Sequence, residues 1–358
     1  MSDQNRFHNW MFHSFSVSAE GLGLFRIIAA LFIFFFLIPG QGAAHFEYLS
    51  AMPDDFFAPP PGPLMLMDGF PSMAVFQTVH SILMVSLLAM LLGYRTKLAS
   101  IFAGISILLL QGFIFSIGKV NHEILTALVP IVMAFSNWGA AFSIDSARWG
   151  EQKTESWPLT LLALFIGFMM FTAGFPKILG GWLDPSTQAT QGHLFNQFFV
   201  RERQALLAEW FVSFDNVFFW ELLDWATVLF EVGFLLAVWK TAWFKTFVGV
   251  AVLFHFSTML MLNIAFVPNF LAYAVFLNWT KIYNYNLEQY RKWTGKHGVK
   301  SIRRSVLVYT LMMAIFFAVL SRLSSINLVL RDSDLMLHEV VIVGGGLVIA
   351  AGILASRN

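Results

Sequence analysis

The chain has 358 residues, of which 58% are hydrophobic and only 12% are charged, and its formal net charge is +1. A typical soluble protein carries about 25% charged residues, so this composition excludes a soluble enzyme, and the balanced charge does not indicate nucleic-acid binding. The lack of cysteine excludes thiolate catalysis, thiolate metal sites and disulfides. We predict an all-α, polytopic transmembrane helical bundle without a soluble domain.

Apolar runs of membrane-spanning length predict nine or ten spans, of which the fourth and the eighth are short. The first run carries Arg26 and has no basic segment before it, so we interpret it as a span and not as a signal peptide. In chain order the runs are Gly21–Pro39, Met73–Leu92, Leu98–Ile117, Ile124–Trp138, Pro158–Gly174, Trp225–Trp239, Phe244–Leu262, Val267–Trp279, Val306–Leu320 and Leu337–Ala355.

Basic residues predict the orientation of these spans. Residues 281–304 form a basic linker with seven Lys and Arg, and placing it in the cytoplasm puts 15 of the 22 Lys and Arg on that side. Both termini are then cytoplasmic. The organisation we predict is a cytoplasmic segment 1–20, a transmembrane domain 21–280, the linker 281–304 and two further transmembrane helices in 305–358.

Two loops on the predicted outer side are long. The first, residues 40–72, contains the run Pro59-Pro60-Pro61-Gly62-Pro63, which predicts irregular or polyproline-like backbone. The second, residues 175–224, contains in 193–220 many aromatic residues around Arg201-Glu202-Arg203. That mixture favours a helix that lies in the membrane interface or caps the bundle.

Ionisable side chains inside spans are costly, so each is a functional candidate. Most of them fall in the outer half by this orientation, which favours a shared polar cavity over independent helix–helix pairs. The groups are His80, the start of the fourth span at Asn121, His122 and Glu123, Lys177, Glu231, His255 near mid-depth, and His338 and Glu339. Several could act as metal ligands, but no compact motif such as HExxH occurs, and we predict no metal site.

Lys177 lies in the stretch Ala173-Gly174-Phe175-Pro176-Lys177, followed by Gly180-Gly181-Trp182. Glycine and proline should end the helix beside the amine. Burial there would favour the neutral amine and make it a base. The alternative is that Lys177 extends to the outer headgroups.

A set of short motifs lies in order between Gly21 and Trp279, and together the motifs resemble those of the HTTM (horizontally transferred transmembrane) domain family. They are Leu24-Phe25-Arg26-Ile27, Leu92-Gly93-Tyr94-Arg95-Thr96, Asn121-His122, Phe142-Ser143-Ile144-Asp145, Ala173–Lys177 with Trp182, Leu229-Phe230-Glu231, and the span pair His255–Trp279. The best-known member is the vitamin K-dependent gamma-glutamyl carboxylase, and other members are bacterial.

The resemblance implies a function on the outer side of the membrane. It implies a cavity for a reduced, vitamin K-like quinone, with Lys177 as the base that deprotonates it and with His122 and Asn121 as its partners. His80, Glu123, Trp182, Glu231 and His255 would form the supporting wall. The bacterial cytoplasmic membrane is the expected location, and Arg26 and Arg95 are expected to anchor helices on the inner side.

Departures from the carboxylase limit what the resemblance implies. The carboxylase has a large lumenal β-rich domain without a counterpart here, and Glu231 stands where it has an aspartate. Carboxylation of protein glutamates is therefore not expected, and a quinol-dependent or carboxylase/epoxidase-like reaction is the enzyme hypothesis. The alternative is a non-catalytic accessory factor for export or maturation of a peptide or protein, which would bind through 193–220. A transporter ranks lower, since inverted repeats are not evident.

Overall fold

The computed structural model describes residues 3–15, 17–37, 43–118, 123–150, 152–295, 299–325 and 335–356. Within these ranges the regular structure is helical and contains no strand, which confirms the all-α prediction. Seven helices there are long and apolar enough to cross a membrane. They are α2 (Ala19–Phe32) with its π-helical continuation Ile33–Leu37, α4 (Met73–Leu92), α5 (Thr96–Phe115), α8 (Trp157–Leu179), α12 (Thr241–Leu262), α15 (Val299–Ser325) and α16 (Leu337–Leu354).

The other three predicted runs also coincide with helices, but these differ from the long apolar ones. Helices α6 (Ile124–Met133) and α13 (Val267–Ala274) have ten and eight residues. At a rise of about 1.5 Å per residue they are too short for a hydrocarbon core of about 30 Å. Helix α11 (Val217–Ala237) is long enough, but it carries three carboxylates, at Glu221, Asp224 and Glu231.

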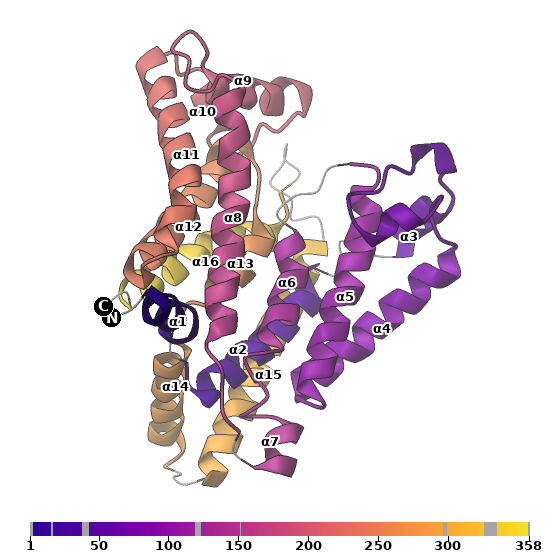
Figure 1. Ribbon diagram of the computed structural model, residues 1–358, viewed down its shortest axis with the longest axis vertical. Helices are drawn as coiled ribbons and strands as arrows, with labels where there is room; N and C mark the ends of the chain where they lie inside the picture. Colours follow the sequence, from indigo (N-terminus) through magenta and orange to yellow (C-terminus); the bar gives the residue numbers. More distant parts are fainter. Residues whose placement is uncertain are drawn as a thin grey trace. The chain divides into compact units, whose positions relative to one another are not determined.

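The chain divides into two compact units. Unit 1 comprises Met1–Ser14, Thr160–Leu277 and Leu320–Asn358, and unit 2 comprises Phe15–Leu159 and Asn278–Val319. In unit 2, α4 and α5 form a hairpin, α6 packs on α5, and α14 (Trp279–Thr294) packs on α2 (Figure 1). Phe25 packs there between the rings of Trp138 and Trp279, at 6.1 and 5.4 Å between centroids.

Arg26 is fully buried in unit 2 and ties α2 to the segment after α6. Its Nη2 donates to the carbonyl oxygen of Phe142 at 2.6 Å, and its Nη1 donates to that of Trp138 at 3.3 Å. Asp145, at the start of α7 (Ile144–Trp149), accepts from the backbone N–H groups of Arg95 and Thr96 and so caps α5. Three of the sequence motifs therefore meet in one network, and Arg26 anchors helices as expected.

Gly93 ends α4 where the backbone lies very close to Ser143 and Arg26. Its φ is +67°, and an added Cβ would lie 2.2 Å from the Cβ of Ser143 and 2.6 Å from Nη1 of Arg26. Gly93→Ala should therefore cost about 2–5 kcal/mol, through left-handed backbone strain and overpacking. Thermal unfolding in detergent measures the loss. Gly295→Ala is the matched control, because Gly295 also lies in the left-handed region (φ +64°, ψ +10°) and an added Cβ would have nothing within 4 Å. Equal losses in the two variants would contradict the packing argument.

The predicted basic linker 281–304 contains a helix. Asn278 caps α14 by accepting from the Lys281 N–H, and Gly295, with φ of +64°, ends it. One face of the helix is buried through Trp279, Tyr283, Leu287 and Tyr290. The opposite face carries an exposed pair, Glu288 and Lys292, at 2.7 Å. The alternation is that of an amphipathic surface helix.

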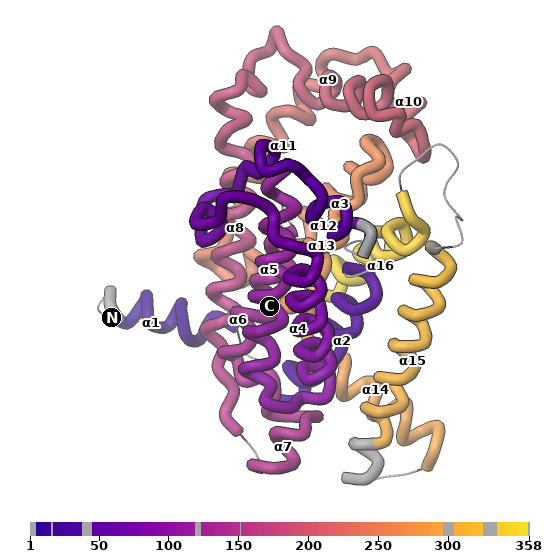
Figure 2. Tube along the Cα trace, turned by 90° about the vertical axis from the view of Figure 1, so that its right-hand side faces the viewer, coloured from indigo at the N-terminus to yellow at the C-terminus, as the bar shows by residue number. Residues whose placement is uncertain are grey.

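In unit 1, α12 packs on α16 and on α11. The predicted capping segment 193–220 is not one helix: it contains the end of α9 (Ala189–Phe195) with its π-helical continuation Asn196–Val200, the short helix α10 (Ala208–Val212) and the start of α11. Figure 2 shows α9 and α10 side by side, and α9 contacts the first turns of α11. Leu194 and Trp220, both fully buried, pack there with Met261 and Leu262 at the end of α12. The segment thus caps this end of unit 1.

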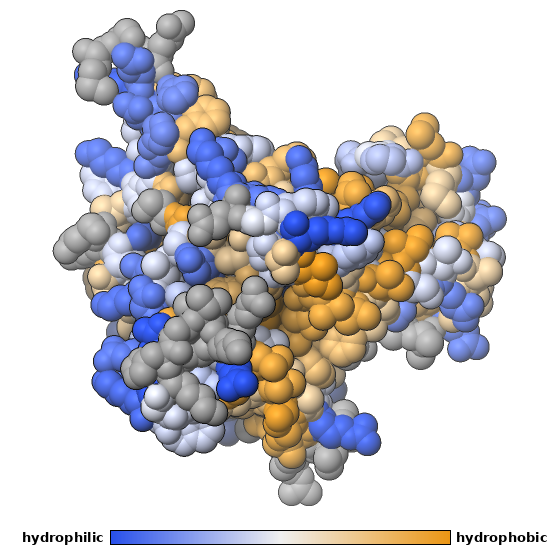
Figure 3. Space-filling model, turned by 90° about the horizontal axis from the view of Figure 1, so that it is seen from below, coloured by the Kyte–Doolittle hydropathy of each residue, from blue (hydrophilic) through white to orange (hydrophobic). Residues whose placement is uncertain are grey.

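Apolar side chains are exposed over a wide area of the molecular surface (Figure 3). On α4, Ile82, Val85 and Leu88 are 44%, 69% and 57% exposed. Exposed branched side chains along a whole helix suit a hydrocarbon solvent, so lipid contact follows from them. In the loop before α4, the helix α3 (Ala43–Ser50) places Phe46 parallel to Phe76 of α4, with 5.2 Å between ring centroids.

Candidate functional site

Lys177 lies in the last turn of α8, and the sequence after it ends the helix there. The N–H of Trp182 donates to the carbonyl oxygen of Lys177 at 3.1 Å, and Gly181 has φ of +80°. This is a Schellman ending, in which a left-handed glycine turns the chain back over the final turn. It brings the Trp182 ring to 5.0 Å from Lys177 Nζ, within the range of a cation–π contact.

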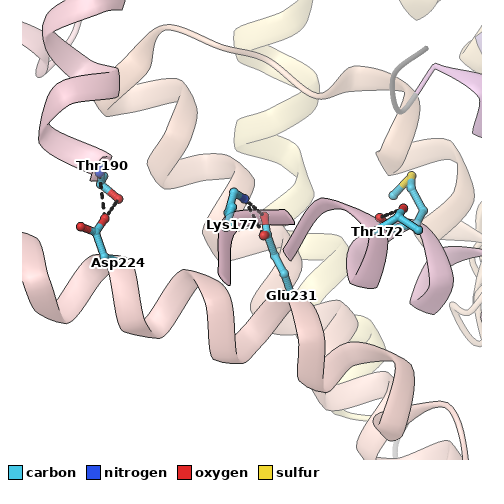
Figure 4. A network of polar contacts seen from close by, with 6 residues as sticks. Thr172, Lys177, Thr190, Asp224 and Glu231 are labelled. Carbon is cyan, nitrogen blue, oxygen red and sulfur yellow. Dashed lines mark hydrogen bonds and ion pairs between the residues drawn. The ribbon is translucent and has the colours of Figure 1, made fainter. Parts of the chain in front are cut away.

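The amine of Lys177 forms an ion pair with Glu231 of α11. Its Nζ lies 2.5 Å from both carboxylate oxygens (Figure 4). The Lys177 side chain is 22% exposed, whereas that of Glu231 is 5% exposed. The carboxylate is therefore the more deeply buried partner. The amine is the more exposed one, and it also contacts the Trp182 ring.

Close packing of α8 on α11 makes this pairing possible. A Cβ at Gly174 would lie 2.7 Å from the Cβ of Glu231, and one at Gly167 would lie 2.6 Å from Cγ2 of Val238. Gly167 and Gly174 are two turns apart and Lys177 follows by three residues, so all three lie on one face of α8. Small residues on that face let the two backbones approach, as is common between membrane helices.

Asp224 lies on the same face of α11, two turns before Glu231, and has a structural role. It is fully buried and accepts from the N–H groups of Ala189 and Thr190, both at 2.8 Å, and from the Thr190 hydroxyl (Figure 4). The carboxylate caps the start of α9, whose own N-cap residue Gln188 makes no side-chain cap. Asp224 was not among the predicted site residues, although its spacing of seven from Glu231 indicates a shared face.

His255 belongs to a buried polar cluster in unit 1. Its Nε2 lies 3.0 Å from the Tyr273 hydroxyl and 3.1 Å from Nδ2 of Asn269, and all three side chains are buried. An amide nitrogen only donates, so with the amide in this orientation Nε2 of His255 accepts and carries no proton. Asn269 and Tyr273 are one turn apart on α13, and this cluster joins that helix to α12.

Two of the remaining predicted site residues belong to unit 2. His80 is half-buried on α4 in unit 2, with its ring centroid 5.9 Å from that of Phe46. Glu123 precedes α6, also in unit 2. Asn121 and His122 lie outside the described residues. The structure thus brings together Lys177, Trp182 and Glu231 from the predicted set, and in its described part no group of three His, Asp or Glu side chains is arranged to hold a metal ion.

Comparison with known proteins gives one match. The model of the HTTM domain matches residues 16–281, which is most of the chain and includes Lys177, Glu231 and the Arg26 network. Neither the curated proteins nor the solved structures contain a match to this chain. With its apolar helices, the chain is a multi-pass integral membrane protein, and it belongs to the HTTM domain family.

Proposed function

We propose that this HTTM protein binds a reduced quinone or another lipophilic molecule with an acidic hydroxyl, and that Lys177 accepts its proton. The observation that carries the proposal is the arrangement of one partly exposed amine between a buried carboxylate and an indole ring. A residue that only anchored a helix to headgroups would not need a buried partner 2.5 Å away.

The residues around Lys177 fit a flat, apolar ligand. The Trp182 ring, with its centroid 5.0 Å from Lys177 Nζ, offers a face for stacking. A hydroquinone bound here would supply an acidic hydroxyl, and Trp182 would bind its ring.

The buried carboxylate explains how a lysine could act as a base here. A protonated amine cannot accept a proton, so Lys177 must first release one. Glu231 lies within hydrogen-bond distance of Nζ, and transfer of the proton to it converts the ion pair into a neutral pair and frees the amine to act as a base. Lys177 then receives the ligand's proton. By the resemblance, His122 and Asn121 would act on the ligand beside it.

Binding of 2-methyl-1,4-naphthohydroquinone to the full chain in lipid nanodiscs tests this proposal, measured calorimetrically without oxygen. We expect saturable binding that weakens at least about fivefold in Trp182→Ala, since an aromatic contact contributes about 1 kcal/mol. Trp293→Ala is the control, because Trp293 is 78% exposed on α14. Absence of binding, or equal binding by Trp182→Ala, would overturn the proposal.

A second candidate function rests on the cap of unit 1. Phe199, Val200 and Trp210 are 63%, 71% and 57% exposed there, and Phe218 at the start of α11 is 76% exposed. Such a surface suits an accessory role in export or maturation of a peptide or protein, as well as contact with lipid headgroups. The accessory role predicts that Lys177→Ala leaves a partner complex intact, whereas Trp210→Asp disrupts it.

We also propose that both termini are cytoplasmic, in a bacterial cytoplasmic membrane. Besides the distribution of basic residues, two contacts within unit 1 support a common side. Trp10 Nε1 of α1 (Asp3–His13) donates to the carbonyl oxygen of Val238 at 3.1 Å, and Lys245 Nζ donates to that of Ser356 at 2.5 Å. The α11–α12 turn therefore lies beside both ends of the chain.

Single cysteines test this orientation cleanly, because the native chain contains none. We expect a membrane-impermeant maleimide to label Ser186→Cys on intact cells, and to label Asn5→Cys and Lys240→Cys only after the cytoplasmic side is opened. All three positions are exposed, and the unsubstituted chain gives the background. Labelling of Lys240→Cys on intact cells would contradict the assignment.

A further inference from the structure

Unit 2 contains a cavity of about 530 Å³ beside the turn between α4 and α5, remote in sequence from the Lys177 pair. Its lining includes two basic side chains, two indoles and two amides: Arg95, Lys97, Trp138, Trp149, Asn137 and Gln152. Nothing in the proposed quinol chemistry uses these residues.

The position of the turn places this cavity at a membrane boundary. Residues 93–95 connect two helices of 20 residues, Met73–Leu92 and Thr96–Phe115, each long and apolar enough to span. A three-residue connection between two such helices lies at the headgroup level, whichever side it faces. Trp149 and Phe135 at the cavity are 57% and 39% exposed, as aromatic side chains in that layer usually are.

The cations at the cavity are available to a ligand. Arg95 and Lys97 are exposed, and neither forms an ion pair with another side chain in the described ranges. Lys97 Nζ lies 4.7 Å from the centroid of the Phe135 ring. The carboxylate of Asp145, which also lines the cavity, is already bonded to the N–H groups of Arg95 and Thr96 and to the Thr96 hydroxyl at 2.7–2.9 Å.

Residues at this cavity have strained backbone conformations. Arg95, Asn137 and Phe142 have φ of 43°, 58° and 52° and are three of the six non-glycine residues with positive φ among those described. Arg95 and Asn137 both line the cavity. Arg and Phe rarely adopt this conformation, whereas Asn adopts it more readily, and such strain is often found at ligand sites, where the surrounding structure maintains it.

We propose that this cavity binds the phosphate of an acidic phospholipid headgroup through Arg95 and Lys97. A guanidinium and an ammonium together match a phosphate diester. The exposed aromatic rings beside them suit the glycerol and the first methylenes of the acyl chains, and basic pockets next to membrane helices recognise acidic lipids in this way. A lipid is favoured over a soluble phosphate ester because the site opens at the headgroup layer.

The test uses the full chain in neutral detergent and measures binding of dioleoyl phosphatidylglycerol by native mass spectrometry. We expect the half-saturating lipid concentration to rise at least tenfold in Arg95→Gln/Lys97→Gln. The matched control, Lys281→Gln/Lys292→Gln, removes two exposed charges from α14 in the same unit and should not change it. Phosphatidylcholine should bind at least tenfold more weakly than phosphatidylglycerol.

Undiminished phosphatidylglycerol binding by Arg95→Gln/Lys97→Gln, with melting temperatures like those of the unsubstituted chain, would overturn the proposal. Equal binding of phosphatidylcholine would overturn it as well. Glycerol 3-phosphate serves as the soluble arm of the test: competition at concentrations similar to those of the lipid would retain the phosphate site but refute a lipid as its ligand.

Discussion

Replacing Lys177 with methionine should destabilise the protein by about 3–5 kcal/mol at neutral pH. The substitution keeps most of the side-chain volume but leaves the carboxylate of Glu231, 5% exposed, without its partner. An uncompensated buried charge carries a penalty of that size. The loss should shrink in acid, because protonation of the carboxyl removes the charge. Thermal unfolding in detergent across a pH series measures both effects.

The reciprocal variants form the control for that result. Glu231→Gln leaves an amine that is 22% exposed and can turn toward water, so its loss should be smaller. The double variant Lys177→Met/Glu231→Gln removes both charges and should recover most of the stability lost in Lys177→Met. A double variant no more stable than Lys177→Met would show that the loss does not come from the unpaired carboxylate.

Arg26→Ala should cost about 3–5 kcal/mol as well, for a different reason. It removes three donor contacts to carbonyl oxygens, those of Trp138, Ala141 and Phe142, and leaves a cavity at a fully buried position. The carbonyl of Phe142 receives the shortest of these contacts, at 2.6 Å, and Phe142 has positive φ. Without these contacts, the segment 138–142 should become accessible to protease before the protein unfolds globally.

Limited proteolysis and thermal unfolding measure the effect of Arg26→Ala. Arg26→Lys should restore only part of the stability, because one ammonium cannot reach three carbonyls as a guanidinium can. Arg148→Ala, at an exposed position on α7, is the control and should change stability by less than about 0.5 kcal/mol. A similar loss in Arg148→Ala would contradict the role assigned to Arg26.

Much of the architecture follows from the sequence, because the positions of apolar helices depend mainly on residues close together in the chain. Each predicted run coincides with a helix, and α4 has the predicted bounds. The sixth run was predicted to begin at Trp225, whereas α11 begins at Val217. Asp224 and Glu221 break the apolar pattern there, but the carboxylate of Asp224 accepts hydrogen bonds from the start of α9, a contact between residues 35 positions apart that no local pattern reveals.

The candidate site was predictable only where local sequence patterns determine it. Gly180 and Gly181 correctly indicated a helix end after Lys177, whereas Pro176, which was also expected to end the helix, lies inside α8. Glu231 was a candidate because a charge inside a span needs an explanation. Their pairing depends on how α8 and α11 meet at Gly174, which is tertiary information. Likewise, the inner-side expectation for Arg95 came from charge alone, whereas the cavity beside it forms between residues 95–98 and 134–152, which lie far apart in the sequence.

The ultraviolet absorbance of bound naphthohydroquinone tests the central claim most directly, since deprotonation shifts the absorbance to longer wavelength. Anaerobic titration of the full chain should produce the hydroquinonate spectrum at neutral pH. Lys177→Arg, which keeps a cation opposite Glu231 but cannot give up its proton, should bind the ligand and leave it protonated. A hydroquinonate spectrum of equal intensity in Lys177→Arg would contradict the assignment of Lys177 as the base.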